Sequence, residues 1–357
     1  MCRNLNSYLR FLEFRFFCLV GLALALSSWS TAQDDSMGLP PRTSQPPASA
    51  QQQPEQQAPG QQSGQPPISP VQSSEDQGRF VFKKQVQEVV LHATVVDDYG
   101  RLVTSLDRSG FSVYQNGQPE TITSFRREDV PVAIGIVIDN SGSMRDKRAK
   151  VNQAVLNLIQ ASNSRDEIFV VNFSQTPYLD QDFTSDVNLL QTALHQVSTR
   201  GSTALYDAVV ASDYHLRNNP RLDKKVLLVI TDGQDNMSRE TLQDTLRKLQ
   251  SNKGATLYAI GLMGLMNEGM TRSGREALQN LAASTGGGAY FPQNLDEVDS
   301  ITRSIARDIR SQYTLAYNPG PNIGSGYQNI RVEARGQNHT HLTVRTRAGY
   351  YPGETVK

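Results

Sequence analysis

The sequence predicts an α/β fold in which a doubly wound, mostly parallel sheet is inserted in a β-sandwich. Two continuous apolar runs, residues 132–138 and 226–230, are typical of strands that are buried on both faces of a sheet. Between Pro131 and Arg310 such runs alternate with helical stretches, which indicates a Rossmann-like parallel sheet with helices on both faces. The segments before and after this region alternate apolar and polar residues, as antiparallel strands with one solvated face do.

The elements of the central region follow from the spacing of its apolar residues. Ser238 is expected to cap the N-terminus of the fourth helix, because a carboxylate follows it in the first turn. The expected strands are 132–138, 168–171, 226–230, 257–260 and 289–291, and the expected helices are 145–162, 186–197, 204–217, 238–249, 274–284 and 295–310.

The flanking segments, residues 79–130 and 311–357, are each too short to bury much of a core. Together they have the size of one β-sandwich, about 100 residues, so we expect them to form a single body around the central domain, residues 131–310. Two independent β-appendages are the alternative. The expected strands are 89–96, 313–317, 330–334 and 342–344, with a hairpin in 111–125 whose turn contains Asn116-Gly117.

The first 78 residues are not expected to contribute to a folded core. Three arginines precede a short apolar run, and Ser30-Thr31-Ala32 follows it, so residues 1–32 are typical of a secretory signal peptide. The run is shorter than the roughly 20 residues that span a bilayer, which favours cleavage over a membrane anchor. Residues 33–78 are rich in Pro, Gln and Ser and are expected to be a disordered linker.

Charge and cysteine content exclude several classes of function. The 357 residues contain 35 Lys and Arg against 35 Asp and Glu, so there is no basic excess for binding nucleic acid. The two cysteines, Cys2 and Cys18, lie within the predicted signal peptide. A thiol nucleophile, a zinc finger and an iron–sulfur cluster are therefore excluded from the body of the protein.

Oxygen-bearing side chains follow the two most apolar strands. Asp139, Ser141 and Ser143 come directly after the first of them, and Asp232 comes directly after the second. Thr203 lies between them, where a helix is expected to begin. Because the carboxyl ends of parallel strands share one edge of a sheet, where ligands bind, these five side chains are expected to meet there.

In these residues the sequence resembles the von Willebrand factor type A domain with its metal-ion-dependent adhesion site. The Asp-x-Ser-x-Ser motif, the distal Thr and the Thr-Asp-Gly motif are all present in the family's order, and the resemblance covers about residues 131–310. It implies that Ser141, Ser143 and Thr203 contact a metal ion, while Asp139 and Asp232 act mainly through water. The flanking β segments are similar to those of secreted bacterial proteins with such a domain.

A site of hard oxygen ligands favours Mg²⁺, with Mn²⁺ or Ca²⁺ as alternatives. Three hydroxyls and two carboxylates that act at a distance leave the charge of the ion incompletely offset. An Asp or Glu carboxylate of a protein partner would complete the coordination shell. Neighbouring residues either contact the partner or only hydrogen-bond the loops: Asn140, Arg145, Gln234, Asp235 and Asn236.

The predicted function is therefore a metal-dependent, non-enzymatic adhesion module that is secreted, periplasmic or exposed on the cell surface. It would be membrane-bound only if the signal peptide stays uncleaved. One alternative is an assembly scaffold that binds a neighbouring copy. The other is a hydrolase or phosphatase, which the sequence disfavours because Ser141 lacks a nucleophile elbow and stands where a haloacid-type phosphatase has its second Asp.

Overall fold

The computed structural model describes residues 88–353, apart from residues 128, 196–198, 219–220, 263–267, 321–322 and 337–340. The described residues belong to one compact unit that spans Met37–Lys357. The predicted signal peptide and linker lie outside the described residues. Within the described part of the chain, no helix is both long and apolar enough to cross a membrane.

The central sheet has six strands, and it is mostly parallel as predicted. The strands are β5 (Val132–Asp139), β6 (Glu167–Phe173), β7 (Pro177–Thr184), β8 (Lys224–Thr231), β9 (Thr256–Gly261) and β10 (Ala289–Tyr290). Their order is β10-β9-β8-β5-β6-β7, and only β7 runs antiparallel to its neighbour. The chain leaves β5 toward β6 and β7, then returns to place β8 on the other side of β5. The carboxyl ends of β5 and β8 therefore flank the point where the strand order reverses, which is where ligands bind in open α/β sheets.

Strand β7 was not predicted from the sequence. It is an edge strand whose residues are mostly half-buried, and polar Asp180, Gln181 and Asp182 occupy its middle. Such a strand lacks the continuous apolar run that marks its buried neighbours.

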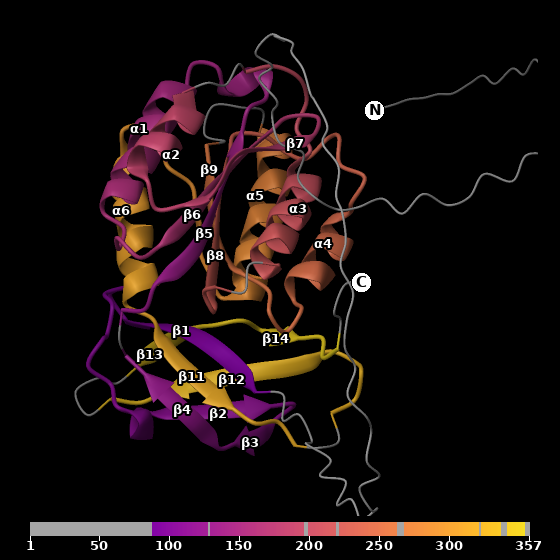
Figure 1. Ribbon diagram of the computed structural model, residues 1–357. Helices are drawn as coiled ribbons and strands as arrows, with labels where there is room; N and C mark the ends of the chain where they lie inside the picture. Colours follow the sequence, from indigo (N-terminus) through magenta and orange to yellow (C-terminus); the bar gives the residue numbers. More distant parts are fainter. Residues whose placement is uncertain are drawn as a thin grey trace, which may run out of the picture. The chain divides into compact units, whose positions relative to one another are not determined.

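Six helices cover the two faces of this sheet (Figure 1). They are α1 (Arg148–Gln160), α2 (Val187–His195), α3 (Leu205–Arg217), α4 (Leu242–Leu249), α5 (Glu268–Thr285) and α6 (Glu297–Arg310). Side chains of α1, α2 and α6 pack with one face, and those of α3, α4 and α5 pack with the other. Helices on both faces of a parallel sheet confirm the doubly wound arrangement.

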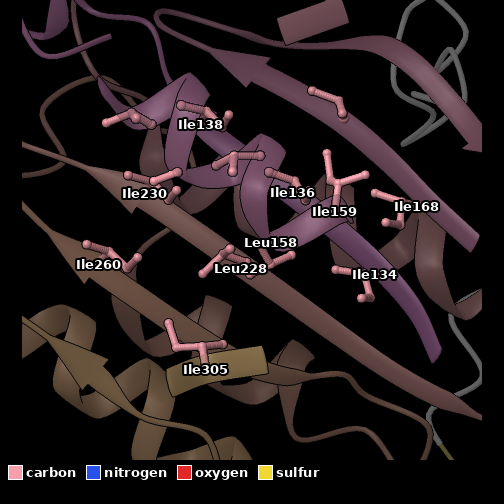
Figure 2. Packing of buried hydrophobic residues seen from close by; sticks show 14 of the residues in the cluster. Ile134, Ile136, Ile138, Leu158, Ile159, Ile168, Leu228, Ile230, Ile260 and Ile305 are labelled. Atoms are coloured by element: carbon pink, nitrogen blue, oxygen red, sulfur yellow. The ribbon is translucent and has the colours of Figure 1, made fainter. Parts of the chain in front are cut away.

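Alternate residues of β5 supply the two hydrophobic cores. Ile134, Ile136 and Ile138 contribute to the cluster that contains residues of α1 and α6, as Figure 2 shows, and each is at most 1% exposed. Ala133 and Val137 contribute to the cluster on the opposite face. Burial on both faces explains why this strand is apolar throughout, unlike a half-solvated strand.

The flanking segments form two four-stranded antiparallel sheets that share one core. The strands are β1 (Val89–Asp97), β2 (Phe111–Gln115), β3 (Gln118–Glu120), β4 (Ile122–Arg126), β11 (Tyr313–Tyr317), β12 (Gln328–Ala334), β13 (Leu342–Arg345) and β14 (Gly349–Tyr350). Their orders are β13-β1-β11-β4 and β14-β12-β2-β3, so each sheet combines strands from before and after the central domain. The insertion of the α/β domain in a sandwich is thus confirmed, and two independent appendages are wrong. The exact domain limits at residues 130 and 310 stay predictions.

Two local features were predicted, and the structure contains only one of them. The hairpin turn at Asn116-Gly117 is present, with positive φ angles of 50° and 81°. The cap at Ser238 is wrong, because α4 begins later and Thr241 is its N-cap, whose hydroxyl accepts a hydrogen bond from the amide of Asp244 at 3.1 Å. Ser238 instead donates its hydroxyl to Asp235.

Candidate metal centre

Strands β5 and β8 deliver two carboxylates to the same edge of the sheet. The strands are paired in parallel with Ile138 opposite Ile230, so Asp139 and Thr231 follow at neighbouring positions. Asp232 comes one residue later. The side chains of Asp139 and Asp232 are both fully buried, at 0% exposure.

The Asp139 carboxylate is held by two donors, one from the loop after β5 and one from the end of β8. Its Oδ1 atom accepts the amide of Ser141 at 2.7 Å, and its Oδ2 atom accepts the hydroxyl of Thr231 at 2.6 Å. Burial raises the pKa of Asp139, these hydrogen bonds oppose that rise, and the nearby negative charge of Asp232 adds to it. A cation placed near both carboxylates would relieve this unfavourable charge.

The two serines connect one carboxylate to the other. Ser141 Oγ lies 3.1 Å from Ser143 Oγ, and Ser143 donates its hydroxyl to Asp232 Oδ1 at 2.7 Å. A short 3₁₀ turn, Gly142–Met144, places the serines on the same side of the loop. Side chains that are 89 residues apart in the sequence thus form one hydrogen-bonded cluster.

Backbone hydrogen bonds bring the loop of Thr203 to this cluster. Asn140 accepts a hydrogen bond from the amide of Arg200 at 2.9 Å, and Gly201 accepts one from Gly142 at 3.3 Å. Gly201 has a φ of 85°, a left-handed conformation that favours glycine. The loops at 139–144 and 200–203 are therefore joined along their main chains.

The loop after β8 fixes Thr203 from the other side. Asn236 accepts the amide of Thr203 at 2.9 Å through its side chain, and its own amide donates to the carbonyl of Thr203 at 3.0 Å. A Cβ atom on Gly233 would lie 3.3 Å from Thr203 Oγ1 and 3.9 Å from Asp139 Oδ2. Gly233 therefore lies next to both Thr203 and Asp139, which places Thr203 beside the cluster formed by the other four predicted side chains.

The neighbouring residues mostly hold the loops. Asp235 accepts hydrogen bonds from Ser238 and from the amide of Tyr206, at the start of α3. Gln234 donates to Ser273 Oγ at 3.2 Å, and Arg145 is exposed beside the cluster. Asn140, which is buried, acts through its backbone, since its amide also donates to Phe173 at 2.6 Å.

Sequence reasoning missed three residues of this centre. Thr231 donates a hydrogen bond to the Asp139 side chain, and the Arg148 guanidinium lies 3.4 Å from the Asp139 carbonyl. Lys147 forms an ion pair with Asp232, and its side chain is only 12% exposed. Thr231 belongs to the Thr-Asp-Gly motif and could have been found there, whereas a lysine at the start of a helix gives no signal of such a role.

The residues of the cluster fit a divalent cation with a preference for oxygen ligands. Two carboxylates and three hydroxyls surround one region, and the two carboxylates repel each other across it. In the described part of the chain, no group of three or more His, Cys, Asp or Glu residues competes as a metal site. The donor set excludes the nitrogen and sulfur ligands that softer metals prefer.

These features define a doubly wound α/β domain with a cluster of oxygen ligands where its strand order reverses. A family model of the von Willebrand factor type A domain matches residues 134–234, a stretch that contains all five side chains of the cluster. The chain therefore carries a von Willebrand factor type A domain.

Several solved structures resemble the chain at low sequence identity. One is a von Willebrand factor type A structure from Catenulispora acidiphila, 12% identical, covering 76% of each chain with a TM-score of 0.42. An aerotolerance-related membrane protein from Bacteroides fragilis is 18% identical and covers 50% of this chain and 98% of its own, with a TM-score of 0.41. Proximal thread matrix protein 1 from the mussel byssus, described with a zinc-occupied metal-ion-dependent adhesion site (MIDAS) motif, is 18% identical. The match covers 55% of this chain and 50% of that protein, with a TM-score of 0.44. A search of the curated proteins gives no match.

Proposed function

We propose that this domain is a metal-dependent, non-catalytic module that binds an acidic residue of a protein partner. The observation that carries the proposal is the pair of fully buried carboxylates, Asp139 and Asp232, within one hydrogen-bonded cluster of hydroxyls. Burying two like charges together is costly unless a cation offsets them. The family match supports the same conclusion.

Ser141, Ser143 and Thr203 would supply hydroxyl ligands, and Asp139 and Asp232 would supply the negative charge. Hard oxygen ligands favour Mg²⁺, with Mn²⁺ and Ca²⁺ as alternatives. When bound, the ion supplies a strong positive field and a coordination position that an acidic side chain can occupy. The protein's part is to hold the five oxygens in place through the backbone contacts between the three loops.

An enzymatic role has less support. A serine nucleophile needs a neighbouring base, usually a histidine. Ser143 donates its hydroxyl to Asp232, and Ser141 contacts Ser143. Both serines are thus engaged within the oxygen cluster. The features of residues 1–32 further support a site of action outside the cytoplasmic membrane.

The metal is tested by thermal and urea unfolding of the protein in a chelator and in increasing Mg²⁺ or Mn²⁺. Saturation at a hundredfold over the dissociation constant should add about 2.7 kcal/mol to the free energy of unfolding. Asp232→Asn should lose this gain, since it removes a charge from the cluster. Asp146→Asn removes an exposed charge from the adjacent loop and should keep it. Equal behaviour of the two variants, or no metal effect at all, would refute the metal site.

The partner chemistry is tested with arrays of peptides that are identical except for Glu or Gln at one position. Binding should require both the metal and the Glu member of each pair, and it should disappear in a chelator. Self-association that depends on the metal in the same way would instead identify the scaffold alternative, in which the acidic residue comes from a second copy. Binding that ignores the Glu-to-Gln change would contradict recognition through a carboxylate.

A further inference from the structure

A lysine whose side chain is largely shielded from solvent contacts the oxygen cluster. The Lys147 ammonium forms an ion pair with Asp232 Oδ2 and donates to the carbonyl of Ser143 at 3.2 Å. Its side chain is 12% exposed, and that of Asp232 is 0% exposed. Asp232 therefore has a hydroxyl donor on one oxygen and an ammonium on the other.

The position of Lys147 is not explained by helix electrostatics. It is the residue before α1, at the helix end where a positive charge is disfavoured by the helix dipole. Lys150, one turn further along, forms an ion pair with Asp296 in which both side chains are more than half exposed. A surface pair of that kind contributes little. The contact with buried Asp232 is what sets Lys147 apart.

We propose that Lys147 is a built-in counter-cation of the metal site, which holds Asp232 when the metal is absent and competes with the metal for that carboxylate. This inference rests on the proposed function. It assigns to Lys147 the control of how tightly the site binds a divalent ion.

The charges of the cluster support this role. Asp139 and Asp232 carry two negative charges when ionised. The Arg148 guanidinium lies 3.4 Å from the backbone carbonyl of Asp139, whereas Lys147 pairs directly with the carboxylate of Asp232. Without Lys147 the Asp232 carboxylate, which is 0% exposed, would lose the ion pair that it forms in the described part of the chain. The lysine thus lowers the cost of keeping the empty site folded, and it also lowers the attraction for an incoming cation.

The experiment compares Lys147→Met with Lys150→Met, which removes the same charge from an exposed pair in the first turn of α1. Mg²⁺ and Mn²⁺ affinities are measured by calorimetry, and stability in a chelator is measured by urea unfolding. Lys147→Met should bind the metal about tenfold more tightly or better, the change that 1.4 kcal/mol produces. In the chelator it should unfold at a lower urea concentration than the wild type, and Lys150→Met should match the wild type in both measurements.

Each outcome bears on the proposal. If the wild type binds metal and Lys147→Met binds it with equal affinity, the proposed role of Lys147 is overturned and the metal site stands. A wild type that binds no metal would overturn the metal site and this inference together. Recovery of folded Lys147→Met only in the presence of metal would support the inference. If that variant folds in neither condition, Lys147→Gln, which retains a hydrogen-bond donor for Ser143, is measured in its place with the same expectations.

Discussion

The two edges of the central sheet use charged residues in opposite ways. At the carboxyl edge, the carboxylates of Asp139 and Asp232 are both buried, and Lys147 pairs with that of Asp232. The Asp139 carboxylate accepts hydrogen bonds from the Ser141 amide and the Thr231 hydroxyl. At the amino edge, the carboxylate of Asp166 has both a hydrogen-bond donor and a cation as partners. It accepts the amide that begins β5, at Val132, at 2.9 Å, and it also pairs with Arg310 at the end of α6.

The amino edge also carries the contacts to the sandwich. Arg345 of β13 pairs with Asp308 of α6 at 2.6 Å. Arg347 donates to the carbonyls of Ser251 and Asn252, which precede β9, at 2.5 and 2.8 Å. Each of these two arginines of the sandwich thus has a partner in the central domain.

The difference separates stability from binding. Charges that are paired across two parts of the fold hold those parts in register and leave nothing for a ligand to offset. At the carboxyl edge the Asp139 carboxylate is held by hydrogen bonds from uncharged groups, so a bound cation would still offset its charge. The same sheet can therefore be anchored at one edge and remain available for binding at the other, and substitutions at the two edges should have separate effects.

The largest effect on stability is expected at the amino edge. Arg345→Met should lower the free energy of unfolding by about 2–3 kcal/mol, because it leaves the Asp308 carboxylate, 4% exposed, without its cation. The figure lies below that for a fully buried pair because Arg345 is 32% exposed. Metal affinity, measured by calorimetry, should not change.

Arg303→Met is the matched control on α6, since its pair with Asp299 is more exposed, and it should cost less than about 0.5 kcal/mol. If Arg345→Met weakened metal binding while the protein stayed folded, the two edges would be coupled and their effects would not be separate.

A pH dependence of intermediate size is expected from His92, on β1. Its partial burial, together with the charges of Lys224, Arg347 and Lys225, lowers its pKa from 6.5 to about 3. Between these two values the unfolded chain binds a proton that the folded protein does not, so stability is lost as the pH falls from about 6.5 toward 3. At pH 5 the loss should be about 1–2 kcal/mol relative to neutral pH.

His92→Gln should flatten this part of the profile, measured by urea unfolding between pH 4 and 7. His341→Gln, at an exposed position, should leave it unchanged. A slope that persists in His92→Gln would mean that other groups at this edge produce the pH dependence.

The contrast between the edges also explains what the sequence could predict. The carboxyl edge was predictable because its five oxygen-bearing side chains directly follow apolar runs or open a helix, and parallel strands bring such positions together. The network at the amino edge was not, since Arg310 and Asp166 are 144 residues apart and nothing local marks them as partners. Lys147 was missed for the same reason, because its partner lies 85 residues away and an isolated lysine is usually solvated.

The smallest effect is expected from Asn236, which positions Thr203. Asn236→Ala removes the side-chain acceptor for the amide of Thr203 and should cost about 1 kcal/mol of stability. Because Thr203 would then be positioned less firmly, metal affinity should fall several-fold but not vanish. Calorimetry with Mg²⁺ or Mn²⁺ measures the change.

Gln234→Ala, two residues earlier, is the matched control, since its side chain donates to exposed Ser273 and not to the Thr203 loop. It should keep the metal affinity of the wild type. Equal losses in the two variants would show that the whole loop, and not the fixed position of Thr203, governs the carboxyl edge. A loss confined to Asn236→Ala would instead mean that this edge depends on hydrogen bonds that position single ligands, whereas the amino edge depends on pairs of opposite charge.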